Sequence, residues 1–499
     1  MNNPVGKKNM RDMLFENKVT LLFVLLCIGA FFASKQTMGF LLGELFTRIG
    51  RNTFLVLSLL IPVLAGMGLN FGIVIGAMAA QIAVFSVSVW GITGFKGFAL
   101  CVLLSTPLSI LFGYGAGKLF NKMKGSEMIG GMVLGYCANG LYQLLFLFIF
   151  GGVIPINNSR LMISGGVGVK NTIDLKDTIK YALDELPLLH VVELALVLMA
   201  LSAVIAWSAA REKGDAAAGK RQVLRLVLSA VGFGLTFVPP IRSLLTTTRY
   251  TLLTAVEVVV AVVIAYTVGS VCYRKFLLHE EADLKKAGMR IALAAVAYAL
   301  TYVDSIYRLL LSVKVPVVTY CMIGLLCFFN EALMKTRLGQ NMRTVGQSLS
   351  VATASGINVD RTRIIAIIFS TVLAGYGQLI SMQNIGTFQT YGAHETVGQF
   401  AIAALLVGGA SVQKATNKQA VLGVVLFHTL FILAPSAGKN LFGNSMIGEY
   451  FRVFVAYGVI ALSLAMHAWK GKAAQKIQLK PQGEKPGAGP SAEAEGAAQ

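Results

Sequence analysis

The stretch "KTRLGQNMRTVGQSLSVATASGINVDRTR", residues 335–363, is a polar, basic segment between two strongly apolar runs, 316–334 and 364–384. Its middle is a series of small side chains, "SVATASG" at residues 350–356. Small residues allow another backbone to approach closely. We therefore predict that this segment is a short helix built for contact at a membrane face. Composition alone leaves open a solvated loop that is small by chance.

The composition of the whole chain explains why a membrane is expected. Of 499 residues, 56% are hydrophobic and only 13% are charged, and the mean hydropathy is +0.70. A soluble domain carries roughly 25% charged residues. The formal net charge is +20, but Lys and Arg cluster between apolar runs, as the positive-inside rule requires. The chain is thus predicted to be an all-α polytopic membrane protein that does not bind nucleic acid.

Fourteen apolar runs are long enough to suggest membrane spans, and the basic clusters place both termini on the cytoplasmic side. The predicted spans are 19–34, 52–68, 70–91, 97–121, 126–150, 187–209, 223–240, 251–272, 289–305, 316–334, 364–384, 398–412, 419–434 and 451–468.

Two apolar stretches are interrupted by glycines, and the first of them has no charged turn. The first, 52–91, contains Pro62 and several glycines, and the second, 398–434, contains Gly408 and Gly409. The first stretch is either two short spans joined by a tight turn or one helix broken inside the membrane. Interrupted segments in both halves of a transporter indicate a substrate path. The alternative is that these glycines serve only close helix packing.

Polar residues within the apolar runs are candidates for contacts with a solute, because small polar ligands need a few placed hydrogen-bonding groups. Asn139 and Gln143 share a helix face by their spacing of four. The predicted substrate path contains Asn70, Gln81, Asn139, Gln143 and Gln378. Hydrogen bonding between helices is the alternative role for each.

The sequence contains no constellation that would make the chain an enzyme. It has no Gly-x-x-x-x-Gly-Lys-Ser/Thr phosphate loop, so we expect no ATPase site in this chain. The six cysteines and five histidines are scattered without the spacing of metal ligands, so we expect no metal site and no cofactor.

The segment "GQSLSVATASGINVDRTR" resembles the cytoplasmic coupling loop of ATP-binding-cassette importer permeases of the ribose/branched-chain amino-acid group. The family pattern is roughly Gly-x-Asn-Pro-x-Ala-Ala-x-x-Ala-Gly-Ile-Asn, and this chain departs from it at Ser348, Leu349 and Val351. Further along, "QFAIAALLVGGASV" (399–412) resembles the family's Ile-Ala-Ala-x-x-Ile-Gly-Gly-x-Ser segment, and "GMGLNFGIVIG" (66–76) is a looser match. The resemblance assigns coupling to the ATPase to Gly346, Ser350, Ala352, Ser355, Gly356, Ile357 and Asn358.

The resemblance covers about 52–154 and 316–468, and such permeases have about ten spans. The four surplus spans fall within 187–315, which resembles nothing in the family. The predicted organisation is a cytoplasmic N-terminus (1–18), a first core half (19–186), an inserted transmembrane segment (187–315), a second core half with the coupling loop (316–470), and a disordered tail (471–499).

The resemblance implies a permease subunit that imports a small polar solute (sugar, nucleoside, amino acid or vitamin) across a bacterial cytoplasmic (inner) membrane. It further implies cytoplasmic ABC ATPase subunits that hold the ATP, a second permease subunit, identical or related, and an extracytoplasmic solute-binding protein. One alternative is an ion-coupled secondary transporter, although the chain shows few acids within its spans. Another is a non-transporting membrane scaffold.

Overall fold

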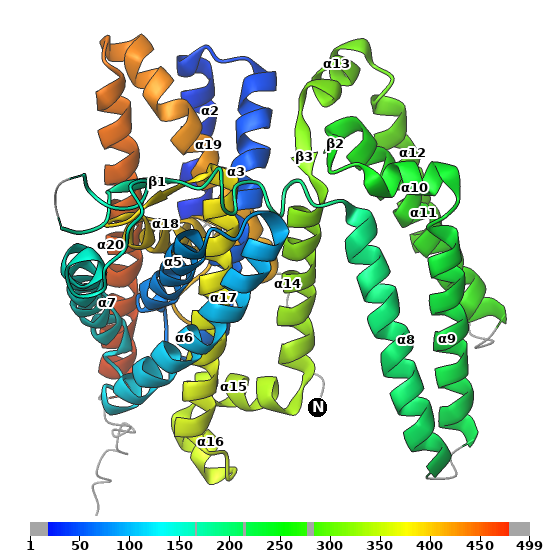
Figure 1. Ribbon diagram of the computed structural model, residues 1–499, viewed down its shortest axis with the longest axis horizontal. Helices are drawn as coiled ribbons and strands as arrows, with labels where there is room; N and C mark the ends of the chain where they lie inside the picture. The colour runs from blue at the N-terminus through cyan, green and yellow to red at the C-terminus, as the bar shows by residue number, and fades with distance from the viewer. Residues whose placement is uncertain (1–17, 165–166, 213–215, 277–283, 479–499) are drawn as a thin grey trace, which may run out of the picture.

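Long apolar runs become helices in this chain because a bilayer leaves every backbone N–H and C=O to be satisfied within its own segment. The computed structural model describes residues 18–164, 167–212, 216–276 and 284–478 (Figure 1). The helices are α2 (Lys18–Ser34), α3 (Met38–Ser58), α4 (Leu60–Leu64), α5 (Ile73–Trp90), α6 (Gly94–Lys122), α7 (Glu127–Leu144) with its π-helical continuation η1 (Leu145–Val153), α8 (Leu188–Glu212), α9 (Ala216–Leu235), α10 (Pro239–Thr246), α11 (Leu252–Phe276), α12 (Leu284–Leu300), α13 (Asp304–Ser312), α14 (Val317–Lys335), α15 (Arg337–Gln347), α16 (Leu349–Ala354), α17 (Val359–Ile385), α18 (Ala393–Val407), α19 (Asn417–Phe442) and α20 (Ser445–Gln478).

Two small antiparallel sheets complete the described part of the chain. Strand β1 (Thr172–Asp174) pairs with β4 (Thr387–Gln389), and β2 (Arg249–Thr251) pairs with β3 (Lys314–Pro316). The β1–β4 pair joins segments from the first and second halves of the chain.

The all-α polytopic prediction is confirmed at the level of class. Among the described residues, 10 helices are long and apolar enough to cross a membrane, or up to 12 if each of two bent helix pairs is one span. The other two predicted spans, 19–34 and 398–412, fall on α2 and α18, which are shorter apolar helices. Fourteen spans therefore remains a prediction.

Helix α17 is the centre of the core, where it packs against α3, α5 and α6 (Figure 1). Glycines allow these backbones to approach closely. A Cβ on Gly76 would lie 2.3 Å from the Thr371 carbonyl oxygen, and one on Gly377 would lie 2.9 Å from Leu55 Cα. Small residues at such crossings are how membrane helices gain packing without a hydrophobic driving force.

Both interrupted stretches of the sequence are pairs of helices joined by non-helical segments. Residues 65–72 separate α4 from α5, and residues 408–416 separate α18 from α19. In the first stretch, the helices on either side of the break, Met38–Leu64 and Ile73–Trp90, are each long and apolar enough to be a separate span. Gly66, Gly68 and Gly409 have positive φ angles of 75°, 70° and 86°, a conformation that glycine adopts without strain.

The segment predicted as an insertion is a tandem repeat of two helical hairpins. Each copy has a long helix, a second helix, a short helix and a strand, as α8–α9–α10–β2 and then α11–α12–α13–β3. The second and short helices meet at bends of 84° in one copy and 87° in the other. Strand residues Tyr250 and Val315 are paired partners, and both occupy the middle of their strands. The β2–β3 pair therefore joins the ends of the two copies.

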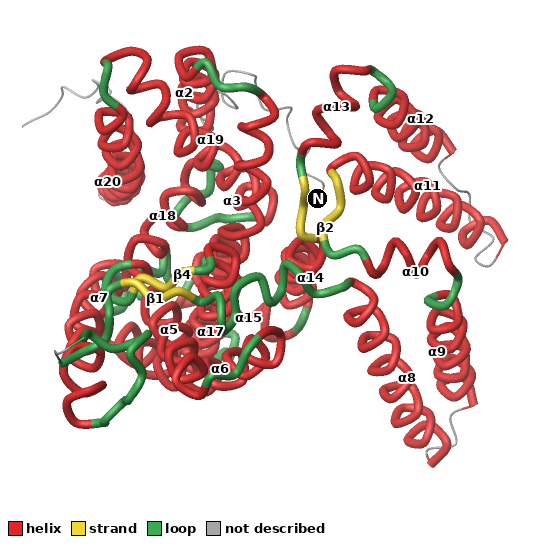
Figure 2. Tube along the Cα trace, turned by 45° about the horizontal axis from the view of Figure 1, so that its top comes forward, coloured by secondary structure: helices red, strands yellow, loops and turns green. Residues whose placement is uncertain are grey.

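The repeat extends away from the core. Figures 1 and 2 show the hairpins α8–α9 and α11–α12 diverging from the β2–β3 pair beside α14. The chain enters and leaves this region at nearly one place, because Thr319 Oγ1 donates a hydrogen bond of 2.5 Å to Asp184 Oδ1.

The predicted tail begins later than the sequence suggested. Helix α20 ends at Gln478, so residues 471–478, predicted to be disordered, are helical. This segment, "GKAAQKIQ", is rich in good helix formers. The prediction assigned it to the low-complexity tail as a whole and did not weigh its helix propensity. Residues 1–17 and 479–499 lie outside the described part of the chain. They include most of the predicted cytoplasmic N-terminus and the end of the predicted disordered tail.

Candidate functional site

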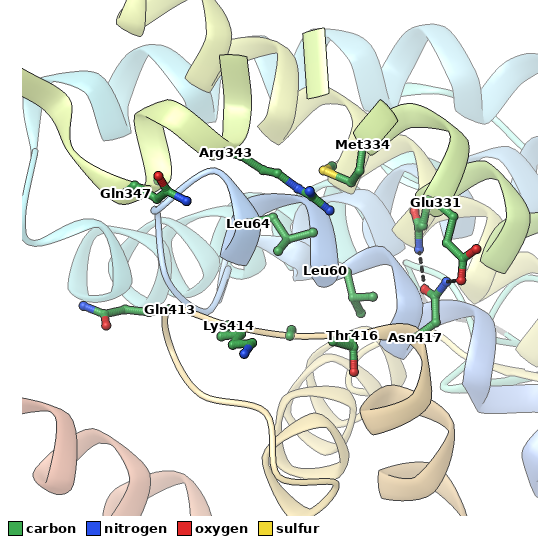
Figure 3. Close-up of a pocket in the computed structure, with 13 residues that line it drawn as sticks. Leu60, Leu64, Glu331, Met334, Arg343, Gln347, Gln413, Lys414, Thr416 and Asn417 are labelled. Carbon is green, nitrogen blue, oxygen red and sulfur yellow. Dashed lines mark hydrogen bonds between the residues drawn. The ribbon is translucent and has the colours of Figure 1, made fainter. Parts of the chain in front are cut away.

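The coupling loop and both interrupted segments meet around one cavity of about 490 Å³ (Figure 3). Helices α4, α14 and α15 form part of its wall, and the segment that leads into α19 forms the rest. The lining residues include Leu60, Leu64, Asn330, Glu331, Met334, Arg343, Gly346, Gln347, Gln413, Lys414, Thr416 and Asn417.

Glycine backbones hold these segments together. A Cβ on Gly346 would lie 2.3 Å from the Leu64 carbonyl oxygen, and one on Gly66 would lie 2.5 Å from Gly346 Cα. A Cβ on Gly68 would approach Val412 Cγ1 to 3.0 Å. The first interrupted segment thus contacts both the coupling loop and the second interrupted segment.

The coupling loop is two short helices with side-chain caps. The Thr336 hydroxyl accepts a hydrogen bond from the Gly339 N–H at the start of α15, and the Ser348 hydroxyl accepts one from the Val351 N–H at the start of α16. Such caps satisfy backbone donors that have no partner within the helix. Asn358 caps α17 by accepting from the Arg361 N–H at 2.9 Å.

Helix α16 ends in a Schellman motif, which explains Gly356. The Ile357 N–H donates to the Ala352 carbonyl and the Gly356 N–H to the Thr353 carbonyl, both at 3.0 Å, and Gly356 has φ = 74°. This motif needs a left-handed residue after the cap, usually glycine. Apart from its two chain neighbours, no described residue has an atom within 4 Å of a Cβ built on Gly356. The tight contact within this chain belongs to Gly346.

The seven predicted coupling residues have different surroundings. Ala352 is buried, Gly346 contacts backbone, and Ile357 is partly buried. Ser350, Ser355, Gly356 and Asn358 are exposed. Two large apolar side chains that were not among the predicted coupling residues are also exposed on α16, Leu349 (42% exposed) and Val351 (55% exposed).

One wall of the cavity is a hydrogen-bonded cluster of amides (Figure 3). Asn417 Nδ2 donates to the Cys327 carbonyl at 2.9 Å and to Glu331 Oε1 at 3.4 Å. Asn330 Nδ2 donates to the Leu57 carbonyl at 3.3 Å and to Asn417 Oδ1 at 3.4 Å. Asn330 is only 4% exposed and its Oδ1 has no partner among the described residues.

Three of the predicted path residues belong to the α5–α6–α17 core. Asn70 Nδ2 donates to Ser370 Oγ at 3.3 Å, but its Oδ1 has no partner in the described part of the chain. The same is true of both polar atoms of Gln81 and of Oε1 of Gln378, and all three side chains are buried. Ser109 Oγ on α6 is also buried and unpartnered there. Such groups are rare in folded proteins and call for water, an ion or a functional role.

The other two path residues form a separate cluster. Asn139 Oδ1 lies 2.9 Å from His394 Nε2 and accepts from Gln143 Nε2 at 3.5 Å, while Asn139 Nδ2 donates to Glu395 Oε2 at 3.3 Å. Tyr457 on α20 extends this cluster through Gln399. No hydrogen bond among the described residues joins this cluster to Asn70, Gln81 or Gln378.

Sequence reasoning missed two buried charges. The Arg363 guanidinium, 2% exposed, pairs with Glu127 at 2.5 Å and donates to the Phe120 carbonyl. Asp184, also 2% exposed, accepts from Thr319, from Gln383 at 2.9 Å and from Asn384 at 2.6 Å. Both charges have partners that are far apart from them in sequence, so no local pattern marks them. Each is paired or hydrogen-bonded, which satisfies the charge where it lies.

Comparisons with known proteins bear on the same region. The family model described as "branched-chain amino acid transport system / permease component" matches residues 145–464, a range that contains the coupling loop. The segment 52–144, included in the resemblance predicted from sequence, lies outside that match. The xylose transport system permease protein XylH of Haemophilus influenzae is 28% identical over 192 residues, which cover 38% of this chain and 48% of the relative. The match thus spans about half the length of that relative. No solved structure matches the chain.

Proposed function

Since this chain belongs to the family of branched-chain amino acid transport system permease components, we propose that it is the transmembrane permease subunit of an ATP-driven importer in a bacterial cytoplasmic membrane. Its task would be to form a solute path and to change that path between inward- and outward-open states. ATP would be bound and hydrolysed on separate cytoplasmic subunits, and no cofactor is assigned to this chain.

Helix α16 carries this proposal. It is a short, capped helix with an exposed face of small residues and two apolar ones, Leu349 and Val351. Its neighbour α15 contacts the segment after α4 through Gly346 and Gly66. A force on α16 would therefore reach the first interrupted segment through α15, and the second through the contact of Gly68 with Val412. The coupling energy would appear as a shift in population between two states of the path.

A small polar solute fits the interior. The relative from Haemophilus influenzae is named a xylose permease, so a pentose is the first solute to test. The unpartnered polar atoms of Asn70, Gln81 and Gln378 support a path along the α5–α17 interface. A second permease subunit would complete the path, and an extracytoplasmic solute-binding protein would deliver the solute.

The test of coupling uses Val351→Asp in the full chain, co-expressed with ABC ATPase subunits of the source organism. Val351 is 55% exposed, so the variant is expected to fold. We expect it to retain less than about a tenth of the co-purifying ATPase and of the uptake, because a desolvated apolar contact is replaced by a charge. Leu284→Asp, on an exposed residue expected on the same side, is the control. Normal ATPase recruitment and uptake by Val351→Asp would remove the basis for α16 as the docking helix.

A further inference from the structure

Two basic side chains line the cavity of Figure 3 without a partner of their own. Arg343 comes from α15 and Lys414 from the segment before α19 (Figure 3). Both residues are exposed, and neither side chain forms an ion pair or hydrogen bond with any residue that the structure describes. Cations without a partner that line one cavity from two separate elements favour an anionic group in that cavity.

The other end of the cavity has the chemistry that binds hydroxyl groups. Asn330 Oδ1 is an acceptor in a side chain that is only 4% exposed, and it lacks a donor among the described residues. Glu331 contributes a carboxylate beside it, with Asn417 donating to one oxygen of that carboxylate at 3.4 Å. A buried acceptor without a donor is unfavourable by about 1–3 kcal/mol, and a ligand hydroxyl would satisfy it.

We propose that this cavity binds a phosphorylated sugar or polyol, with its phosphate between Arg343 and Lys414 and its hydroxyls toward Asn330 and Glu331. The volume of about 490 Å³ lies in the range of small-molecule sites. Glu331 disfavours an anion at its own end of the cavity, and this sets the orientation of the ligand. The inference concerns regulation of the proposed importer and so rests on the proposed function.

Binding there would affect the proposed coupling because the ligand bridges two elements. Arg343 belongs to the coupling loop, while Lys414 belongs to the segment between α18 and α19. A ligand that holds them at one separation stabilises one of the two transport states. We expect a sugar phosphate on the α16 side to slow uptake.

The experiment is calorimetric titration of the purified full chain, in nonionic detergent, with ribose 5-phosphate. Inorganic phosphate and ribose are titrated in parallel. We expect ribose 5-phosphate to bind more tightly than phosphate, and ribose to bind undetectably in the same range. Arg343→Gln and Lys414→Gln should each weaken binding about tenfold or more, as loss of a charge-assisted hydrogen bond does.

Two matched variants control for the general loss of positive charge. Arg337→Gln lies on the same helix as Arg343, and Lys418→Gln lies close to Lys414 in sequence, but neither residue lines the cavity. Both should bind ribose 5-phosphate as the unaltered chain does. Arg343→Lys, which keeps the charge, should bind more tightly than Arg343→Gln. Absence of binding up to millimolar ligand, or equal binding by all variants, would overturn the proposal.

A lipid headgroup is the other source of a phosphate, and a second titration separates the two. The chain is placed in nanodiscs with and without phosphatidic acid. A soluble ligand site keeps its affinity for ribose 5-phosphate in both. If phosphatidic acid abolishes that binding, the site belongs to lipid and the proposal is wrong. The titration contains no ATPase, so it is independent of the test of ATPase recruitment. If the chain recruits ATPase in that test but does not bind ribose 5-phosphate here, only this inference is contradicted.

Discussion

At the scale of single residues, Gly346 and Gly356 are glycines for different physical reasons. Gly346 has no room for a Cβ, since its backbone lies against Leu64 and Gly66, whereas Gly356 has open space and a left-handed backbone. A substitution at Gly356 therefore strains α16 and alters the exposed surface, while a substitution at Gly346 separates the coupling loop from the core.

Gly346→Ala is expected to destabilise the chain by about 1–3 kcal/mol, because the methyl group would force the α4 and α15 backbones apart. Gly324→Ala is the control, since Gly324 is helical and nothing lies within 4 Å of its Cβ position. Thermal unfolding of both purified variants measures the difference. Equal midpoints would mean that the contact between α15 and the segment after α4 is not rigid.

Gln81→Leu separates a transport role from a packing role. Both polar atoms of Gln81 are buried without a partner among the described residues, so an apolar side chain of similar size should raise the free energy of unfolding by about 1 kcal/mol. If Gln81 lines the path, uptake should fall in the same variant. Gln383→Leu should instead be destabilising, because Gln383 donates to buried Asp184 at 2.9 Å. Normal uptake by a stabilised Gln81→Leu chain would move the path elsewhere.

At the scale of elements, the apolar runs predicted most helices but not how they meet. Each run from 52–68 to 451–468 contains a described helix, because backbone satisfaction in lipid is a local requirement. The Arg363–Glu127 ion pair could not be predicted from the sequence because its partners lie on α17 and α7. In the sequence, Arg363 is one of several basic residues that flank an apolar run. The cavity could not be predicted either, although the coupling loop and both interrupted segments around it were identified by their glycines and small residues.

The duplicated hairpins form an element pair whose ends meet. Thr319 and Asp184 are hydrogen-bonded, so the residues just before and just after 187–315 lie close together. The symmetric β2–β3 pairing satisfies the backbone at this junction from within the repeat itself. If this segment is a unit inserted into a complete core, as predicted from the sequence, the core should fold without it.

Removal of residues 187–315, with a short Gly/Ser linker from Leu186 to Pro316, should therefore leave a folded core. Loop closure across so short a distance is entropically mild, and the Asp184–Thr319 contact is retained. We expect a monodisperse protein with one cooperative unfolding transition. Aggregation of this variant, with normal behaviour of the full chain, would show that the hairpins are part of the core.

At the scale of the whole molecule, the proposed docking of a cytoplasmic ATPase requires that α16 face the cytoplasm. The positive-inside rule predicts that α16 and the hairpin ends that carry Arg211 and Lys285 lie on the cytoplasmic side. The structure contains no membrane, and the two hairpins diverge (Figure 2). The sidedness of α11–α12 is therefore the most informative point to test.

Single cysteines at four exposed positions test this arrangement, after the exposed native Cys137, Cys272 and Cys321 are replaced by alanine. An impermeant thiol reagent should label Ser350→Cys and Leu284→Cys only from the cytoplasmic side, and Ser159→Cys and Thr247→Cys only from outside. Each variant is labelled in intact cells and in inverted vesicles, and cysteine in an unfolded sample sets full reaction. Labelling of Leu284→Cys from outside would mean that α11 and α12 do not cross the membrane as a hairpin from the outer side. The span parity of the inserted segment would then be wrong, although the cytoplasmic side of α16 would still be decided by Ser350→Cys alone.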